Sequence, residues 1–162
     1  MSEVSFDPFA GGEILRVSPT TAPQQEIITS SKMSDEANTA FNEGVSLTII
    51  GSLDFDLLKK CCNTLIERHD ILRATFSSLG DEICLQEAQP VLIPFEDLRS
   101  YKPEERRRIV DELLQNIAIS PMNLEEGPLF FAWVKQFEDE RFELIIVVPH
   151  VICDGWSIGL LL

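Results

Sequence analysis

The chain has 162 residues, of which 27 are acidic and 13 are basic, so its formal net charge is −14. Hydrophobic residues make up 44% of the sequence, which is enough apolar surface for the core of one globular domain and excludes disorder over most of the chain. The acidic balance, with no basic stripe to neutralise phosphates, argues against a nucleic-acid-binding role.

Membrane and secretory segments are not expected either. The apolar runs are short; Leu144–Val148, for example, has five residues, whereas a membrane-spanning helix needs about 20. The start of the chain carries Glu3 and Asp7 and no apolar core, unlike a secretory signal. Four cysteines without a C-x-x-C pair suggest reduced thiols and no zinc site. We therefore expect a cytoplasmic protein.

The first half of the chain predicts a short strand, a helix, a second strand and a long helix. Residues 1–19 should be irregular apart from a strand at Ile14–Val17, and a helix should begin near Thr21, since Thr21 and Gln24 have capping-box spacing. The β-branched run Val45–Ile50 predicts a strand. The clearest helix spans residues 55–68, with Asp54 as its cap. Its core-facing stripe is predicted to contain Leu58, Cys61, Cys62, Leu65 and Ile66.

The second half predicts two hairpins separated by a helix. Leu72–Phe76 and Glu82–Gln86 read as paired strands, and a helix should begin at Pro103. Two apolar runs follow, Leu129–Phe137 and Phe142–Val148, and the second is apolar on both faces, which is typical of a central strand covered on both sides. The sequence thus predicts an α/β (α+β) two-layer sandwich, with a mixed sheet covered by helices.

A group of reactive side chains follows the strand predicted to be central. His150 comes directly after it, Asp154 lies four residues on, and Gly155 allows a tight turn. Residues 156–158 look like the first turn of a helix, whose free N–H groups can bind a developing negative charge. A general base, an orienting carboxylate and an oxyanion donor would then lie together, which is what acyl transfer to a nucleophile requires.

Other interpretations of this segment remain open. The simplest is a purely structural one, in which the histidine is hydrogen-bonded at the end of a strand and the aspartate caps a helix. A metal site made by His150, Cys153 and Asp154 would lack a fourth ligand. A catalytic triad using Ser157 would lack the G-x-S-x-G turn that presents a nucleophile.

Four segments in order resemble the condensation domains of nonribosomal peptide synthetases. They are S-P-T-T-A-P-Q-Q-E-I at residues 18–27, R-H-D-I-L-R-A-T-F at 68–76, E-G-P-L at 126–129, and H-V-I-C-D-G-W-S at 150–157. The resemblance implies a fold similar to chloramphenicol acetyltransferase, with two lobes around a tunnel. Residues 1–162 would then be a partial condensation domain, namely an N-terminal lobe that is incomplete at its C-terminus.

The resemblance also implies an activity and partners. Such domains form an amide bond between an acyl or peptidyl thioester and an aminoacyl acceptor. Both arrive on the phosphopantetheine arms of carrier domains, so no cofactor and no metal would be bound directly. The partners would be those carriers and the second lobe, with an adenylation domain downstream.

By position in the motifs, the resemblance assigns roles to individual residues. His150 would be the catalytic histidine that positions or deprotonates the acceptor amine, and the N–H of Gly155 would be a candidate oxyanion donor. Asp154 would form a buried structural ion pair with Arg68, or alternatively with Arg73. The sequence departs from the usual pattern at Pro149, which replaces the first of two adjacent histidines, and at Cys153, where a small polar residue is more common.

We expect this chain to be inactive in condensation by itself, because the second wall of the tunnel would be missing. Two other functions remain open. One is a non-catalytic module of the same fold that docks carriers, with its loop misaligned by the proline. The other is an H-x-x-x-D-G acyltransferase that uses a coenzyme A donor, although the segments at 18–27 and 68–76 match the condensation family more closely.

Overall fold

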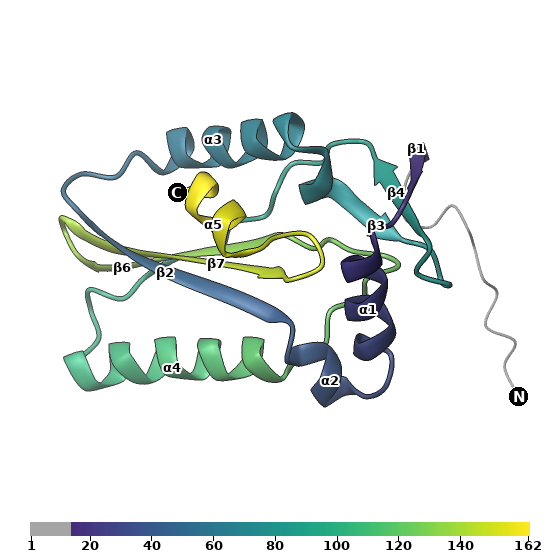
Figure 1. Cartoon of the computed structure of the whole chain (residues 1–162). Helices are drawn as coiled ribbons and strands as arrows, with labels where there is room; N and C mark the ends of the chain where they lie inside the picture. Colours follow the sequence, from purple (N-terminus) through teal and green to yellow (C-terminus); the bar gives the residue numbers. More distant parts are fainter. Residues whose placement is uncertain (1–13) are drawn as a thin grey trace, which may run out of the picture.

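The computed structural model describes residues 14–162, which form two sheets and the helices around them (Figure 1). In chain order the elements are β1 (Ile14–Pro19), α1 (Ala22–Ser31), α2 (Asp35–Thr39), β2 (Asn42–Ile50), α3 (Phe55–Arg68), the 3-10 helix η1 (Asp70–Arg73), β3 (Ala74–Phe76), β4 (Glu82–Gln86), β5 (Phe95–Asp97), α4 (Pro103–Ile119), β6 (Phe131–Glu138), β7 (Arg141–Pro149) and α5 (Gly155–Leu161). The predicted irregular start of the chain, up to residue 13, lies outside the described residues.

The larger sheet has the strand order β2-β7-β6-β5, and the smaller sheet has the order β1-β4-β3. Only β5 runs parallel to its neighbour, β6, so the larger sheet is mixed. In Figure 1, α3 runs above this sheet and α4 runs below it. The predicted fold class, helices over a mixed sheet, is confirmed.

Strand β7 is central and buried on both faces, as predicted. Leu144, Ile146 and Val148 contribute to the main core together with Cys62 and Ile66 of α3. The alternating residues Ile145 and Val147 pack instead against Val110 of α4 and its neighbours. This two-residue alternation between the two helical layers is the reason that β7 is apolar throughout.

The helix starts follow the predicted signals. Helix α3 has the predicted bounds, and the carboxylate of Asp54 accepts a hydrogen bond from the N–H of Leu57 at 2.9 Å. At α1, the side-chain oxygen of Gln24 accepts a bond from the N–H of Thr21 at 3.0 Å, which is one half of the predicted capping box. Within residues 14–162, none of the helices combines the length and the apolar character needed to cross a bilayer.

Some local predictions are wrong. The strand predicted at Leu72–Phe76 is shorter, because the N–H of Leu72 bonds to the carbonyl of His69 at 3.0 Å and keeps the chain in the 3-10 turn η1 until residue 73. Cys62 is buried as predicted, whereas Cys61 is exposed. Strand β2 begins at Asn42, three residues before the predicted start, because Asn42, Glu43 and Gly44 pair with the end of β7.

Candidate active site

His150 is the first residue after β7, and its backbone is held by the start of β2. Its N–H donates to the carbonyl of Phe41 at 2.7 Å, which continues the β2–β7 ladder by one bond. The side chain is 39% exposed, so the imidazole lies at the surface of the described chain and not in the apolar interior. The end of a buried central strand therefore presents this ring on a rigid support.

Two oxygen atoms lie beside one nitrogen of the ring. The imidazole Nδ1 is 3.0 Å from the carbonyl oxygen of Cys153 and 2.9 Å from Oε1 of Glu43. Glu43 comes from β2, where it is paired with Val148. This contact could not be predicted from the sequence, because Glu43 lies outside the four family-like segments and only the pairing of β2 with β7 brings it to His150.

The turn after His150 is packed against the rest of the molecule. Val151, Ile152 and Cys153 are all buried. The side-chain amide of Gln24 on α1 donates to the carbonyl of Val151 at 3.1 Å. The segment at residues 18–27 and the segment at residues 150–157, which are far apart in the sequence, are thus in direct contact.

Asp154 caps the start of the short helix α5 and is exposed. Its Oδ1 accepts the N–H of Ser157 at 2.8 Å and the hydroxyl of Ser157 at 2.6 Å. These hydrogen bonds are the main reason that the pKa of Asp154 is lowered; the interaction with His150 contributes least. The same hydroxyl bond shows that Ser157 is directed to Asp154, as in a helix cap, and does not form the triad considered from the sequence.

The structure does not form the predicted ion pair between Asp154 and an arginine. Arg73 donates to Asp70 and to the carbonyl of Gln86, each at 2.5 Å, and its side chain is only 15% exposed. Arg68 is exposed at the end of α3 and has no ion-pair partner within residues 14–162. The prediction fails because Asp70, two residues beyond Arg68, already neutralises Arg73, while Asp154 is used to cap α5.

Cys153 is a packing residue in this turn. Its side chain is buried, and burial, followed by the nearby negative charges of Glu43 and Asp154, raises the pKa of its thiol to about 11. A protonated thiol is a poor metal ligand. Residues 14–162 contain no group of three or more His, Cys, Asp or Glu side chains arranged to hold a metal ion.

Gly155 is the first residue of α5. A Cβ atom built on Gly155 would have no heavy atom within 4 Å, so the space around this backbone is open. Its N–H points from the first turn of the helix and has no acceptor within the described part of the chain. This N–H group is therefore available to a bound molecule, as an oxyanion donor would have to be.

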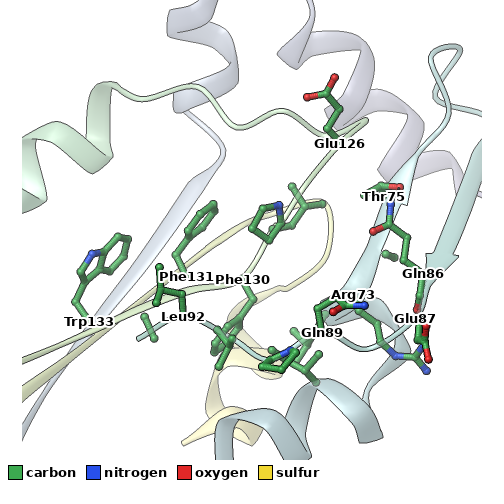
Figure 2. Close-up of a pocket in the computed structure, with 18 of the residues that line it drawn as sticks. Arg73, Thr75, Gln86, Glu87, Gln89, Leu92, Glu126, Phe130, Phe131 and Trp133 are labelled. Atoms are coloured by element: carbon green, nitrogen blue, oxygen red, sulfur yellow. Dashed lines mark hydrogen bonds between the residues drawn. The ribbon is translucent and has the colours of Figure 1, made fainter. Parts of the chain in front are cut away.

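A separate cavity of about 570 Å³ lies away from His150, beside the start of β6 (Figure 2). Figure 2 shows Phe131 and Trp133 at one end of it and Arg73, Gln86 and Glu87 at the other. None of the residues from His150 to Ser157 lines this cavity. The residues with candidate chemical roles thus lie outside it, with the exception of Arg73.

The chain is similar in sequence to parts of longer synthetases. Chondramide synthase cmdD of Chondromyces crocatus is 32% identical over 127 residues, which is 77% of this chain but 3% of the synthase. Phosphinothricin tripeptide synthetase PhsB of Streptomyces viridochromogenes is 30% identical over 145 residues, or 86% of this chain and 12% of the synthetase. The chain therefore spans only a small part of these relatives.

Among solved structures, the starter condensation domain of rhizomide synthetase RzmA superposes with a TM-score of 0.80 at 19% identity, covering 90% of this chain and 35% of that one. The first condensation domain of the calcium-dependent antibiotic synthetase gives a TM-score of 0.78 at 17% identity, covering 92% of this chain and 37% of that one. The model of the family described as "Condensation domain" matches residues 15–162. With its motifs, its fold and this match taken together, the chain belongs to the condensation-domain family of nonribosomal peptide synthetases.

Proposed function

We propose that this chain forms the N-terminal lobe of a condensation domain that makes amide bonds in nonribosomal peptide synthesis. The observation that carries the proposal is the partly exposed imidazole of His150 at the end of the central strand, within the H-x-x-x-D-G segment. The family match over residues 15–162 supports it. The proposed substrates are an acyl or peptidyl thioester as donor and an aminoacyl thioester as acceptor, each on the phosphopantetheine arm of a carrier domain.

In the proposed reaction, the amine nitrogen of the acceptor attacks the carbonyl carbon of the donor thioester. A C–N bond forms while the C–S bond breaks, and the proton lost by the amine passes through His150 to the sulfur of the leaving thiolate. The N–H of Gly155 would donate to the carbonyl oxygen while it carries negative charge, since no described residue accepts this N–H and a Cβ atom at Gly155 would meet open space. A neutral imidazole is suited to accept the proton near neutral pH.

The proposed partners are the two carrier domains, a second lobe that completes the tunnel, and an adenylation domain. The chain covers 35% of the rhizomide condensation-domain structure, which supports the assignment to one lobe of two. With one lobe alone the thioester and the amine would not be held together, so we expect the 162 residues alone to give no condensation product.

The proposed function is tested with His150→Ala in a two-lobed domain that contains these residues, assayed with loaded donor and acceptor carriers. We expect the rate of amide formation to fall by about 100-fold or more, since general acid–base catalysis typically contributes about 10²–10⁴-fold. His69→Ala is the matched control, because His69 is the other histidine of the chain and its ring is exposed at the end of α3. Equal rates in the parent and in His150→Ala would refute the catalytic assignment.

A carrier-docking module of the same fold is the second candidate. The observation that favours it is the exposed Asp154, which caps α5 and forms no ion pair with Arg68 or Arg73 in the described chain. Carrier binding to the two-lobed parent domain without any product would support docking over catalysis.

A further inference from the structure

The carboxylate of Glu43 is held beside the imidazole of His150 by strand pairing. Asn42 pairs with Pro149 and Glu43 pairs with Val148, and the N–H of His150 then bonds to the carbonyl of Phe41. The backbones on both sides of the contact are thereby fixed. Glu43 Oε1 lies 2.9 Å from Nδ1 of the ring.

The surroundings of Nδ1 determine where the proton of the neutral ring lies. The carbonyl oxygen of Cys153, 3.0 Å away, can only accept a hydrogen bond, and an ionised carboxylate also only accepts. Two acceptors around one nitrogen require that this nitrogen carries the hydrogen. Nε2 then holds the lone pair, and it has no hydrogen-bond partner among residues 14–162.

We propose that Glu43 is a positioning residue for His150. It keeps the proton on Nδ1, orients the ring so that Nε2 faces the substrate, and stabilises the positive charge of the ring after Nε2 has accepted a proton. This inference rests on the proposed function, because the proton in question is the one released by the acceptor amine. The same division of labour between a carboxylate and an imidazole operates in the Ser-His-Asp triad.

Both side chains are partly shielded from solvent, so the negative charge of Glu43 acts on the imidazole of His150 with less screening by water. The side chain of Glu43 is 31% exposed and that of His150 is 39% exposed. Charges at this depth are screened less than fully exposed pairs. Asp154 also interacts with the ring, and its carboxylate is already engaged by Ser157.

The first test uses the chain alone and does not depend on an assay of enzymatic activity. With ¹⁵N-labelled histidine, long-range ¹⁵N–¹H spectra of the neutral ring should show hydrogen on Nδ1 of His150, and His150→Gln identifies the signals that belong to it. Glu43→Leu removes one of the two acceptors and should raise the fraction of rings with hydrogen on Nε2. A parent ring protonated on Nε2, or a tautomer ratio unchanged in Glu43→Leu, would overturn the proposal.

The second test uses Glu43→Gln in the two-lobed domain. Glutamine has nearly the same shape, but it carries no charge and has an NH2 donor in place of one carboxylate oxygen, so kcat should fall roughly 10- to 100-fold while KM for both carriers and Tm stay near the parent values. Glu143→Gln is the matched control, because Glu143 lies on β7 and bonds to Ser46 of β2, so the variant removes a carboxylate from the same strand pair.

The catalytic role of His150 and the positioning role of Glu43 are distinguished by their variants. If His150→Ala lowers the rate and Glu43→Gln does not, then the positioning role is wrong and the proposed function stands. If the two-lobed parent forms no amide, then the proposed function is wrong. If His150→Ala has the rate of the parent, then the catalytic role of His150 is wrong, whatever tautomer the ring adopts.

Discussion

The thiol of Cys153 and the carboxylate of Asp154 are adjacent in the chain but have opposite surroundings. Cys153 is 3% exposed and packs in the main core, whereas Asp154 is exposed at the start of α5. Burial penalises the thiolate, and the negative charges of Glu43 and Asp154 penalise it further. The environment of each residue, and not its position in the motif, therefore decides its reactivity.

We predict that Cys153 resists alkylation. With its pKa raised to about 11, only about one thiol in a thousand is ionised at pH 8, and the thiolate is the reactive form. Iodoacetamide labelling followed by peptide mass spectrometry should modify the exposed Cys61 first. The rate at Cys153 should rise as the pH approaches 11. Labelling of Cys153 as fast as Cys61 at pH 8 would contradict this prediction.

At the scale of the element, α5 shows how a short helix is fixed at its start. Its seven residues are too few to be stable as an isolated helix. Asp154 caps the free N–H of Ser157, while Ile158 and Leu161 pack on the main core. The cap and two apolar contacts together hold the helix that follows the histidine turn.

The contribution of Asp154 should depend on pH. The pKa of its carboxyl is lowered in the folded chain, so the charged cap stabilises above the unfolded pKa, near 3.9, and this contribution is lost as the pH falls through the lowered folded-state value. In urea unfolding, Asp154→Ala should be less stable than the parent at pH 7, and the difference should shrink towards about pH 2.

Asp154→Asn is the control, because asparagine caps helices about as well as aspartate without a charge. The difference in unfolding free energy between Asp154→Asn and Asp154→Ala should not change with pH. A difference between parent and Asp154→Ala that is constant from pH 7 to about pH 2 would show that the carboxylate charge has no part in the cap.

The long elements were predictable from the sequence because their own residues determine them. Helix α3 carries its cap and its apolar stripe within residues 54–68, and both were recognised correctly apart from Cys61. The three-residue strand β5 was missed, because it depends on a distant partner: the carbonyl of Pro94 accepts the N–H of Val134 at 2.9 Å. Helix α2, with five residues, was missed for lack of length.

At the scale of the whole molecule, the buried strand β7 joins the two helical layers. Ile145 has no exposed surface and contacts the α4 side, while its neighbours on either side in the strand face the α3 side. Because β7 is packed closely on both faces, a cavity left by a smaller side chain in this strand would not be readily filled by its neighbours. Stability should therefore be sensitive to small changes in β7.

We predict that Ile145→Val lowers the free energy of unfolding by about 0.5–1.5 kcal/mol, because it removes one buried methylene group. Ile50→Val is the matched control on the neighbouring strand β2, where the side chain is 76% exposed. The measurement is urea unfolding of the parent and both variants. Equal effects of the two substitutions would mean that the layer between β7 and α4 is not closely packed.

The candidate site was predictable only in part. The position of His150 at the end of a central strand followed from the apolar run before it, and α5 followed from the cap residues after it. The arginine expected to meet Asp154 could not be located, because the sequence does not show that Asp70 binds Arg73. Glu43 could not be found at all, since its role depends on how two distant strands are aligned.

That alignment has a consequence for the whole strand pair. β2 and β7 are matched residue for residue from Asn42–Pro149 to Ile50–Arg141 without an irregularity. Because side chains alternate between the faces of a sheet, sliding one strand by a single position would turn Glu43 to the opposite face. All nine residue pairs of β2 and β7 therefore help to keep the carboxylate of Glu43 beside the imidazole of His150, including the pairs at the opposite end of the two strands.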